Sequence, residues 1–165
     1  MMLVLALVWT NGCGDDGDSQ PEDPPNDQMI APAECPDDLP EMREGMLGVS
    51  EEGNIEAKLV TADKIPLGWY HNDWVIEFTD AESGEPVDDI MFGLVRPWMP
   101  LHRHDGNGQF PEITELDAGE WSFDGINITM GGVWEFQIPI DESSAGADNI
   151  VFRVCNSQPK PEARD

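Results

Sequence analysis

The sequence predicts an all-β protein: an immunoglobulin-like antiparallel β-sandwich of about seven strands, preceded by a disordered acidic linker. Short segments of alternating apolar and polar residues, rich in β-branched and aromatic side chains, recur after residue 46. Turn sequences containing Gly or Pro separate them, and no stretch requires a helix longer than one turn. Residues 14–44 are mostly polar or acidic and carry too little apolar surface to offset the entropy of ordering.

The expected strands, in chain order, cover residues 55–60, 74–79, 90–98, 113–116, 121–126, 134–138 and 150–154. Trp134-Glu-Phe-Gln-Ile138 alternates most cleanly, as a half-buried antiparallel strand does. The large aromatic residues of these segments are expected to form the core, where each contributes about 1.5–3 kcal/mol through burial. Trp98 is the one aromatic residue placed beside a functional site.

The chain of 165 residues fits one folded domain with flanking segments. The expected organisation is a signal segment at residues 1–13, a linker at 14–45, the sandwich at 46–156 and a tail at 157–165. The net charge of −26 favours cations or basic partners and argues against binding of nucleic acid, because polyanions repel one another.

Residues 3–9 form an apolar run that is too short to span a membrane but suits a signal peptide. The run ends near Cys13, and the acidic segment follows at once. This arrangement resembles a bacterial lipoprotein signal, although Thr10 stands where leucine is usual and no Lys or Arg precedes the run. The resemblance implies that Cys13 becomes a lipidated N-terminus, with the protein anchored to the membrane in the periplasm or at the cell surface. An ordinary secretory signal is the alternative.

Two further cysteines, Cys35 and Cys155, flank the expected sandwich. With Cys13 lipidated they form an even pair, and an exported protein reaches an oxidising compartment. A disulfide between them would close a long loop and contribute about 4–5 kcal/mol in the chain-entropy model. Two unpaired thiols are the alternative.

The segment Trp98-Met-Pro-Leu-His-Arg-His104 concentrates soft metal ligands in an otherwise carboxylate-rich chain. Histidines two residues apart project to the same side of an extended strand, so His102 and His104 could present both imidazoles to one ion if the strand geometry persists through them. Thioether sulfur and imidazole nitrogen suit copper, and Met99 and Met130 are the candidate sulfur ligands. Met130 joins the site only if its turn lies at the same end of the sandwich, which the sequence does not decide.

Four elements occur in order in the second half of the chain: Gly84-Glu-Pro-Val87, Met99-Pro-Leu-His-Arg-His104, Gly119-Glu-Trp121 and Met130-Gly-Gly-Val-Trp134. Together they resemble the YtkA-like domain, a relative of FixH-type proteins. The resemblance implies an extracytoplasmic domain with a role in copper handling. Arg103 departs from the commoner spelling, in which glycine separates the two histidines.

These observations favour a membrane-tethered, extracytoplasmic copper-binding or copper-delivery module that exchanges its ion with a donor or acceptor protein. Zinc is the alternative metal, since two imidazoles and a carboxylate such as Asp105 satisfy it. The alternative function is a metal-free adhesion or scaffold domain on a lipoprotein stalk. No enzymatic activity is expected, because the sequence has no Ser-His-Asp order, metal-hydrolase spacing or Gly-rich phosphate loop.

Overall fold

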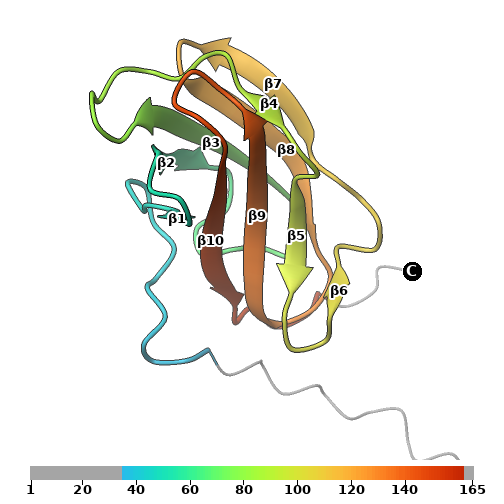
Figure 1. Cartoon of the computed structure of the whole chain (residues 1–165). Helices are drawn as coiled ribbons and strands as arrows, with labels where there is room; N and C mark the ends of the chain where they lie inside the picture. The colour runs from blue at the N-terminus through green and yellow to red at the C-terminus, as the bar shows by residue number, and fades with distance from the viewer. Residues whose placement is uncertain (1–34, 162–165) are drawn as a thin grey trace, which may run out of the picture.

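The structure, a computed structural model, describes residues 35–161, which form a sandwich of two antiparallel sheets (Figure 1). The signal segment and Cys13 lie outside the described residues. The strands are β1 (Val49–Ser50), β2 (Ile55–Ala62), β3 (Tyr70–Asp80), β4 (Met91–Phe92), β5 (Arg96–Met99), β6 (His104–Asp105), β7 (Glu112–Asp117), β8 (Glu120–Ile128), β9 (Gly132–Glu142) and β10 (Asp148–Asn156). Within this part of the chain, no helix is long and apolar enough to cross a membrane.

The prediction of an immunoglobulin-like sandwich is confirmed by the strand order. One sheet runs β2-β3-β8-β7; the other runs β1-β10-β9-β5-β6, with β4 paired to β9. If the short strands β1, β4 and β6 are set aside, seven strands remain, and their order corresponds to the A-B-E-D and C-F-G sheets of an immunoglobulin constant domain.

Six of the seven expected strands occur where the alternation predicts them, usually longer by a few residues at each end. The seventh, expected as one strand over residues 90–98, is broken into β4 and β5. The break lies opposite Pro139 of β9, which has no amide hydrogen to donate to a neighbouring strand. There the Gly93 amide donates to the Pro139 carbonyl at 2.8 Å, and the pairing resumes at Arg96.

The core lies between the two sheets and is built from the inward-facing residue of each alternating pair. Its centre is aromatic: the Trp74 ring packs edge-on against Phe136 and Phe152, with ring centroids 5.2 and 6.0 Å apart. Such edge-to-face pairs add to the free energy gained by burying their area. Packing also reaches back beyond residue 46, because Met42 is buried against the same core.

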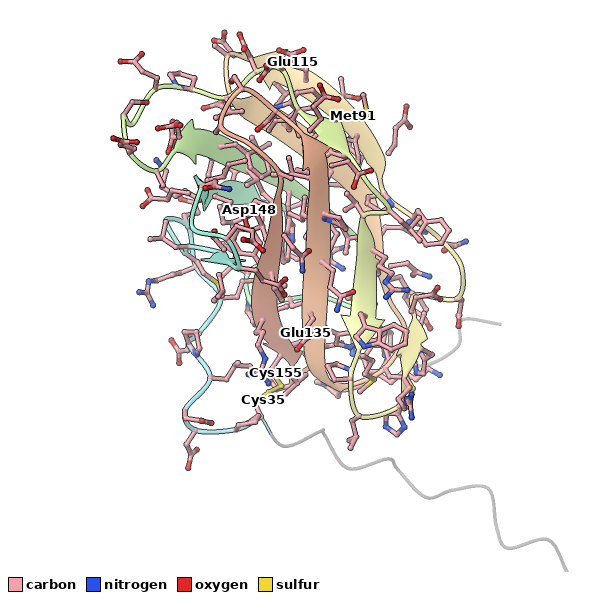
Figure 2. All side chains as sticks on the ribbon, viewed as in Figure 1. Cys35, Met91, Glu115, Glu135, Asp148 and Cys155 are labelled. Carbon is pink, nitrogen blue, oxygen red and sulfur yellow. A yellow bond between two sulfur atoms is a disulfide. The ribbon has the colours of Figure 1, made fainter. Side chains whose placement is uncertain are left out.

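The last strand, β10, is fastened to the N-terminal part of the chain at both of its ends. At its C-terminal end, Cys35 and Cys155 form a disulfide with Cα atoms 5.8 Å apart, the pairing expected from the sequence. Figure 2 shows this pair at the lower end of the sandwich, away from Met91 and Glu115 at the upper end. The disulfide therefore joins the first described residue, Cys35, to the last strand at the lower end of the sandwich.

At the other end of β10, the buried Asp148 carboxylate binds the segment that leads into β2. It accepts hydrogen bonds from the Ser50 hydroxyl at 2.7 Å and from four backbone amides at 2.7–3.1 Å, those of Glu52, Asn54, Ile55 and Asn149. Burial acts to raise the pKa of Asp148, but these bonds, the Ser50 hydroxyl first, outweigh it and hold the pKa below its ordinary value. The carboxylate is thus kept charged and fully occupied by the chain itself.

Candidate metal-binding site

The candidate site lies at one end of the sandwich, which we call the histidine pole. It comprises the β5–β6 turn (residues 100–103), β6, the β8–β9 turn (residues 129–131) and the end of β10. The strand registers bring these segments together: Trp98 pairs with Glu135 near the start of β9, and Gly132 at that start pairs with Asn156. Figure 1 shows the end of β5, β6 and the tip of β10 at the same lower end.

His104 is the centre of the pole. It is half-buried and lies directly opposite Met99 in the β5–β6 ladder. Its Nδ1 lies 2.7 Å from the Asp105 carbonyl oxygen. Because a carbonyl only accepts hydrogen bonds, this contact assigns the proton to Nδ1, and in the neutral ring the lone pair is then on Nε2. That Nε2 faces the Met130 sulfur at 3.2 Å.

Met130 reaches His104 from the β8–β9 turn, twenty-six residues further along the chain. Its carbonyl accepts a hydrogen bond from the Trp134 indole at 3.0 Å and a longer one from the Asn156 amide at 3.5 Å. The residue is 37% exposed, and its contact with the imidazole lies at the surface. The two turns therefore meet, which is the spatial condition for a shared site.

Met99 lies opposite His104 in the β5–β6 ladder, and its side chain is buried. Directly opposed residues of an antiparallel ladder project to the same face of the sheet, so Met99 shares the inward face with His104. It is 1% exposed and belongs to the hydrophobic core. A ligand role for Met99 thus depends on approach of the ion from the interior side of His104.

His102 does not lie on a strand, so the condition for alignment by extended geometry, a strand that runs through both histidines, is not met. Residues 100–103 form a turn in which the Arg103 amide donates to the Met99 carbonyl at 2.8 Å, and Arg103 adopts a left-handed backbone with φ of 55°. The turn nevertheless leaves the exposed His102 ring near His104, with ring centroids 6.0 Å apart and planes inclined by 31°. The two imidazoles are close because the turn folds back, not because a strand runs through them.

A buried clamp holds the β6 segment against the end of β8. The Asn127 amide donates to the Gly106 carbonyl at 2.8 Å, and a Cβ on Gly106 would lie 2.2 Å from the Asn127 carbonyl oxygen. Only glycine permits this approach. Since Asn127 is three residues before Met130, the clamp fixes the distance between the two turns that carry the site.

Trp98, placed beside the site from the sequence, does not belong to it. It pairs with Asp105 on the outer face of β5, where the Arg96 guanidinium carbon lies 4.6 Å from its ring centroid. The aromatic ring that reaches the site is that of Trp134, whose centroid lies 5.8 Å from that of His104. Trp134 reads as a core residue in the sequence, because strand alternation does not distinguish a core aromatic from one that supports a site.

Two buried asparagines of the pole were also missed from the sequence, Asn127 and Asn156. Asn156 occupies an inward position in the otherwise apolar alternation of β10, and that mismatch is a usable signal. Asn127 stands between the buried Ile126 and Ile128 and pairs with the exposed His71, so the alternation gives no such signal for it. Asp105, considered as a zinc ligand, uses one carboxylate oxygen to accept the Gly108 amide at 2.8 Å. Among residues 35–161, no group of three His, Cys, Asp or Glu residues is arranged to hold a metal ion.

The fold and the pole define a small all-β sandwich domain with a thioether and two imidazoles gathered at one end. The YtkA-like family model matches residues 50–139, more than half of the chain, and the chain belongs to the YtkA-like family. The matched region ends within β9 and includes both turns of the histidine pole. No curated protein and no solved structure gives a significant match to the chain.

Proposed function

We propose that this domain binds copper, as Cu(I), at the histidine pole and passes it to or from another protein without catalysing a reaction. The observation that carries the proposal is the 3.2 Å contact between His104 Nε2 and Met130 Sδ. Both atoms are electron-pair donors when the ring is neutral with its proton on Nδ1. Two such donors facing each other are satisfied by a proton or by a metal ion.

The spacing of these donors suits an ion after a small adjustment. With bonds of about 2.0 Å to nitrogen and about 2.3 Å to sulfur, the 3.2 Å separation corresponds to an N–metal–S angle of about 95°. Tetrahedral or trigonal coordination needs a wider angle, hence a few tenths of an ångström more separation. The Met130 side chain has three rotatable bonds and is partly exposed, so it supplies that movement at little cost.

Ligand chemistry favours copper over zinc. Thioether sulfur is a soft ligand that suits Cu(I), whereas zinc sites in proteins use Cys, His and carboxylate groups. At the histidine pole the two imidazoles lie close together, the Met130 thioether faces His104, and Met99 stands opposite His104 in the β5–β6 ladder. The nearby Asp105 carboxylate is already engaged by the Gly108 amide.

The exposure of two candidate ligands supports exchange of the copper ion with a partner protein. Met130 and His102 both reach solvent, so a second protein's ligands have access to the ion one bond at a time. We assign His104 as the resident ligand, Met130 as its partner, and Met99 and His102 as the ligands that complete the shell. A copper donor or acceptor protein is the expected partner.

An extracytoplasmic location belongs to the same proposal. The Cys35–Cys155 disulfide fits an oxidising compartment such as the periplasm or the cell surface. The apolar run before Cys13 supports export, with lipidation of that cysteine as the anchor.

The test is a titration of the purified protein with Cu(I), kept reduced by ascorbate so that the disulfide survives, and separately with Cu(II) and Zn(II). We expect one Cu(I) per chain, an affinity lowered at least a hundredfold by His104→Ala, and a smaller loss from His102→Ala.

Two matched controls are available on the same domain. Met91 is exposed on β4 at the other end of the sandwich, and His71 is exposed on β3, so Met91→Ala and His71→Ala should leave Cu(I) binding unchanged. Equal stoichiometry and affinity in wild type and in the His102→Ala/His104→Ala double variant would rule out this site. A wild-type melting temperature that no metal shifts would favour the scaffold alternative instead.

A further inference from the structure

Trp134 contacts both members of the His104–Met130 pair. Its indole Nε1 donates to the Met130 carbonyl at 3.0 Å, and its ring meets the His104 ring edge-on at 5.8 Å between centroids, with planes inclined by 73°. It is 0% exposed, so the surrounding core fixes its own position. A single rigid side chain thus joins two segments that are far apart in the sequence.

We propose that Trp134 is a positioning residue that sets the Cu(I) affinity of the histidine pole. This inference rests on the proposed copper site. Methionine has three rotatable bonds, so a sulfur on an untethered turn would have to be ordered each time an ion binds. The indole hydrogen bond fixes the Met130 backbone, and the ring edge limits rotation of His104, so the two donors already face each other before an ion arrives.

The other contacts of the pair are weaker or act on one member only. The Asn156 amide reaches the Met130 carbonyl at 3.5 Å, and the Asp105 carbonyl fixes only the His104 tautomer. Nor is the Trp134 bond a general property of buried indoles here. The buried indole nitrogens of Trp74 and Trp121 have no hydrogen-bond acceptor in the described structure.

Removing the indole N–H while keeping an aromatic ring at this position isolates the positioning effect. Two replacements do this: Trp134→Phe, and substitution of Trp134 by benzothienylalanine, which keeps the indole shape but has no donor. The second remains informative if the smaller phenylalanine leaves a cavity that impairs folding. Cu(I) affinity is measured by competition with a colorimetric Cu(I) chelator, and we expect about a tenfold loss for each replacement, the magnitude of one lost hydrogen bond.

A matched control exists close to the pole, just before β3. The Trp69 indole also donates to a backbone carbonyl, that of Gln158 at 2.8 Å, but has no contact with His104 or Met130 among the interactions described. Trp69→Phe should therefore leave Cu(I) affinity within twofold of wild type. A general loosening of the pole, by contrast, would lower affinity in both variants.

Two readouts accompany the affinity measurement, and the first of them separates positioning from a merely structural role. In a Met130→Ala background the Trp134 replacement should cause no further loss of affinity, because the sulfur that it positions is gone. Ag(I), a soft monovalent ion without redox chemistry, should quench tryptophan emission in wild type and in Trp69→Phe. The quenching should be much weaker in Trp134→Phe, which lacks the indole beside His104, so this second readout reports where the ion binds.

The inference is overturned if wild type binds Cu(I) and both Trp134 replacements bind within twofold of it, or if their losses add fully to that of Met130→Ala. Wild-type protein that binds neither Cu(I) nor Ag(I) overturns the proposed function itself. The two failures are therefore distinguishable.

Discussion

Both ends of β10 are tied to the N-terminal part of the chain, one by hydrogen bonds and the other by a disulfide. Only the C-terminal end adjoins the candidate metal site. At its start, Asp148 accepts five hydrogen bonds from the segment before β2 and its own neighbour, so both carboxylate oxygens are occupied. At its end, Cys155 is tied by a disulfide, while the adjacent Asn156 reaches toward the Met130 carbonyl.

The difference shows which polar clusters have capacity for a ligand. A carboxylate saturated by amides is a structural anchor, however charged it is, because any ion must first displace those bonds. At the histidine pole the ties act on backbone groups, such as the Met130 and Gly106 carbonyls, and leave the His104 and Met130 side-chain donors facing each other. Fixing the backbone while sparing side chains is what makes this end a candidate site.

The largest effect on stability is expected at the covalent end. The disulfide joins cysteines 120 residues apart, so the Cys35→Ser/Cys155→Ser double variant should lose about 4–5 kcal/mol of unfolding free energy by the chain-entropy estimate. Urea unfolding of the purified variant measures the loss, and the wild type treated with a thiol reductant should match it. An unchanged denaturation midpoint would show that the bridge only follows a body already held by its core.

The next effect concerns Asp148. Asp148→Asn should lower the unfolding free energy by about 2–3 kcal/mol at neutral pH, without altering Cu(I) affinity. The pKa of Asp148 is lower in the folded chain than in the unfolded one, so its contribution is complete above the ordinary aspartate pKa. The contribution is lost as pH falls through the lower, folded-state pKa.

The measurement is urea unfolding of both proteins over a series of acidic pH values, where the stability difference should shrink. Asp89, exposed and bound to Ser144, provides the control carboxylate: Asp89→Asn should change stability much less. A wild type–Asp148→Asn difference that grows with acidity would contradict the assignment.

A smaller loss is expected from the clamp between the two turns. Gly106→Ala places a Cβ against the Asn127 carbonyl, so the clamp must open, with a cost of about 1–3 kcal/mol in stability. Unlike the Asp148 change, it should also weaken Cu(I) binding several-fold, because it moves β6 relative to Met130. Calorimetric titration and thermal unfolding of the same sample test both effects.

Gly108 lies in the same turn region, and a Cβ there meets nothing within 4 Å. Gly108→Ala therefore carries only the strain of its positive φ and should leave copper affinity near wild type. If Gly106→Ala lowers stability but not affinity, the clamp does not set the geometry of the site.

The sequence predicted the strands because burial on one face leaves a period-two pattern in each of them, as in Trp134-Glu-Phe-Gln-Ile138. It failed at residues 90–98, where the interruption depends on Pro139 of a different strand. It also left open how the His102 and His104 rings approach each other, since a turn that brings rings together by folding back has no periodicity. Trp98 and Trp134 look alike in the sequence, yet they face opposite sides of the sheet.

By itself, the sequence determined the all-β class, the cysteine pair and the presence of His102, His104, Met99 and Met130 near turns, because composition and alternation are local properties. Only the tertiary structure decided that the β5–β6 and β8–β9 turns share one pole. Their meeting depends on strand order, on a glycine–asparagine approach and on the Trp134 hydrogen bond. Each of these is a contact between segments far apart in the chain, and local pattern carries no record of such contacts.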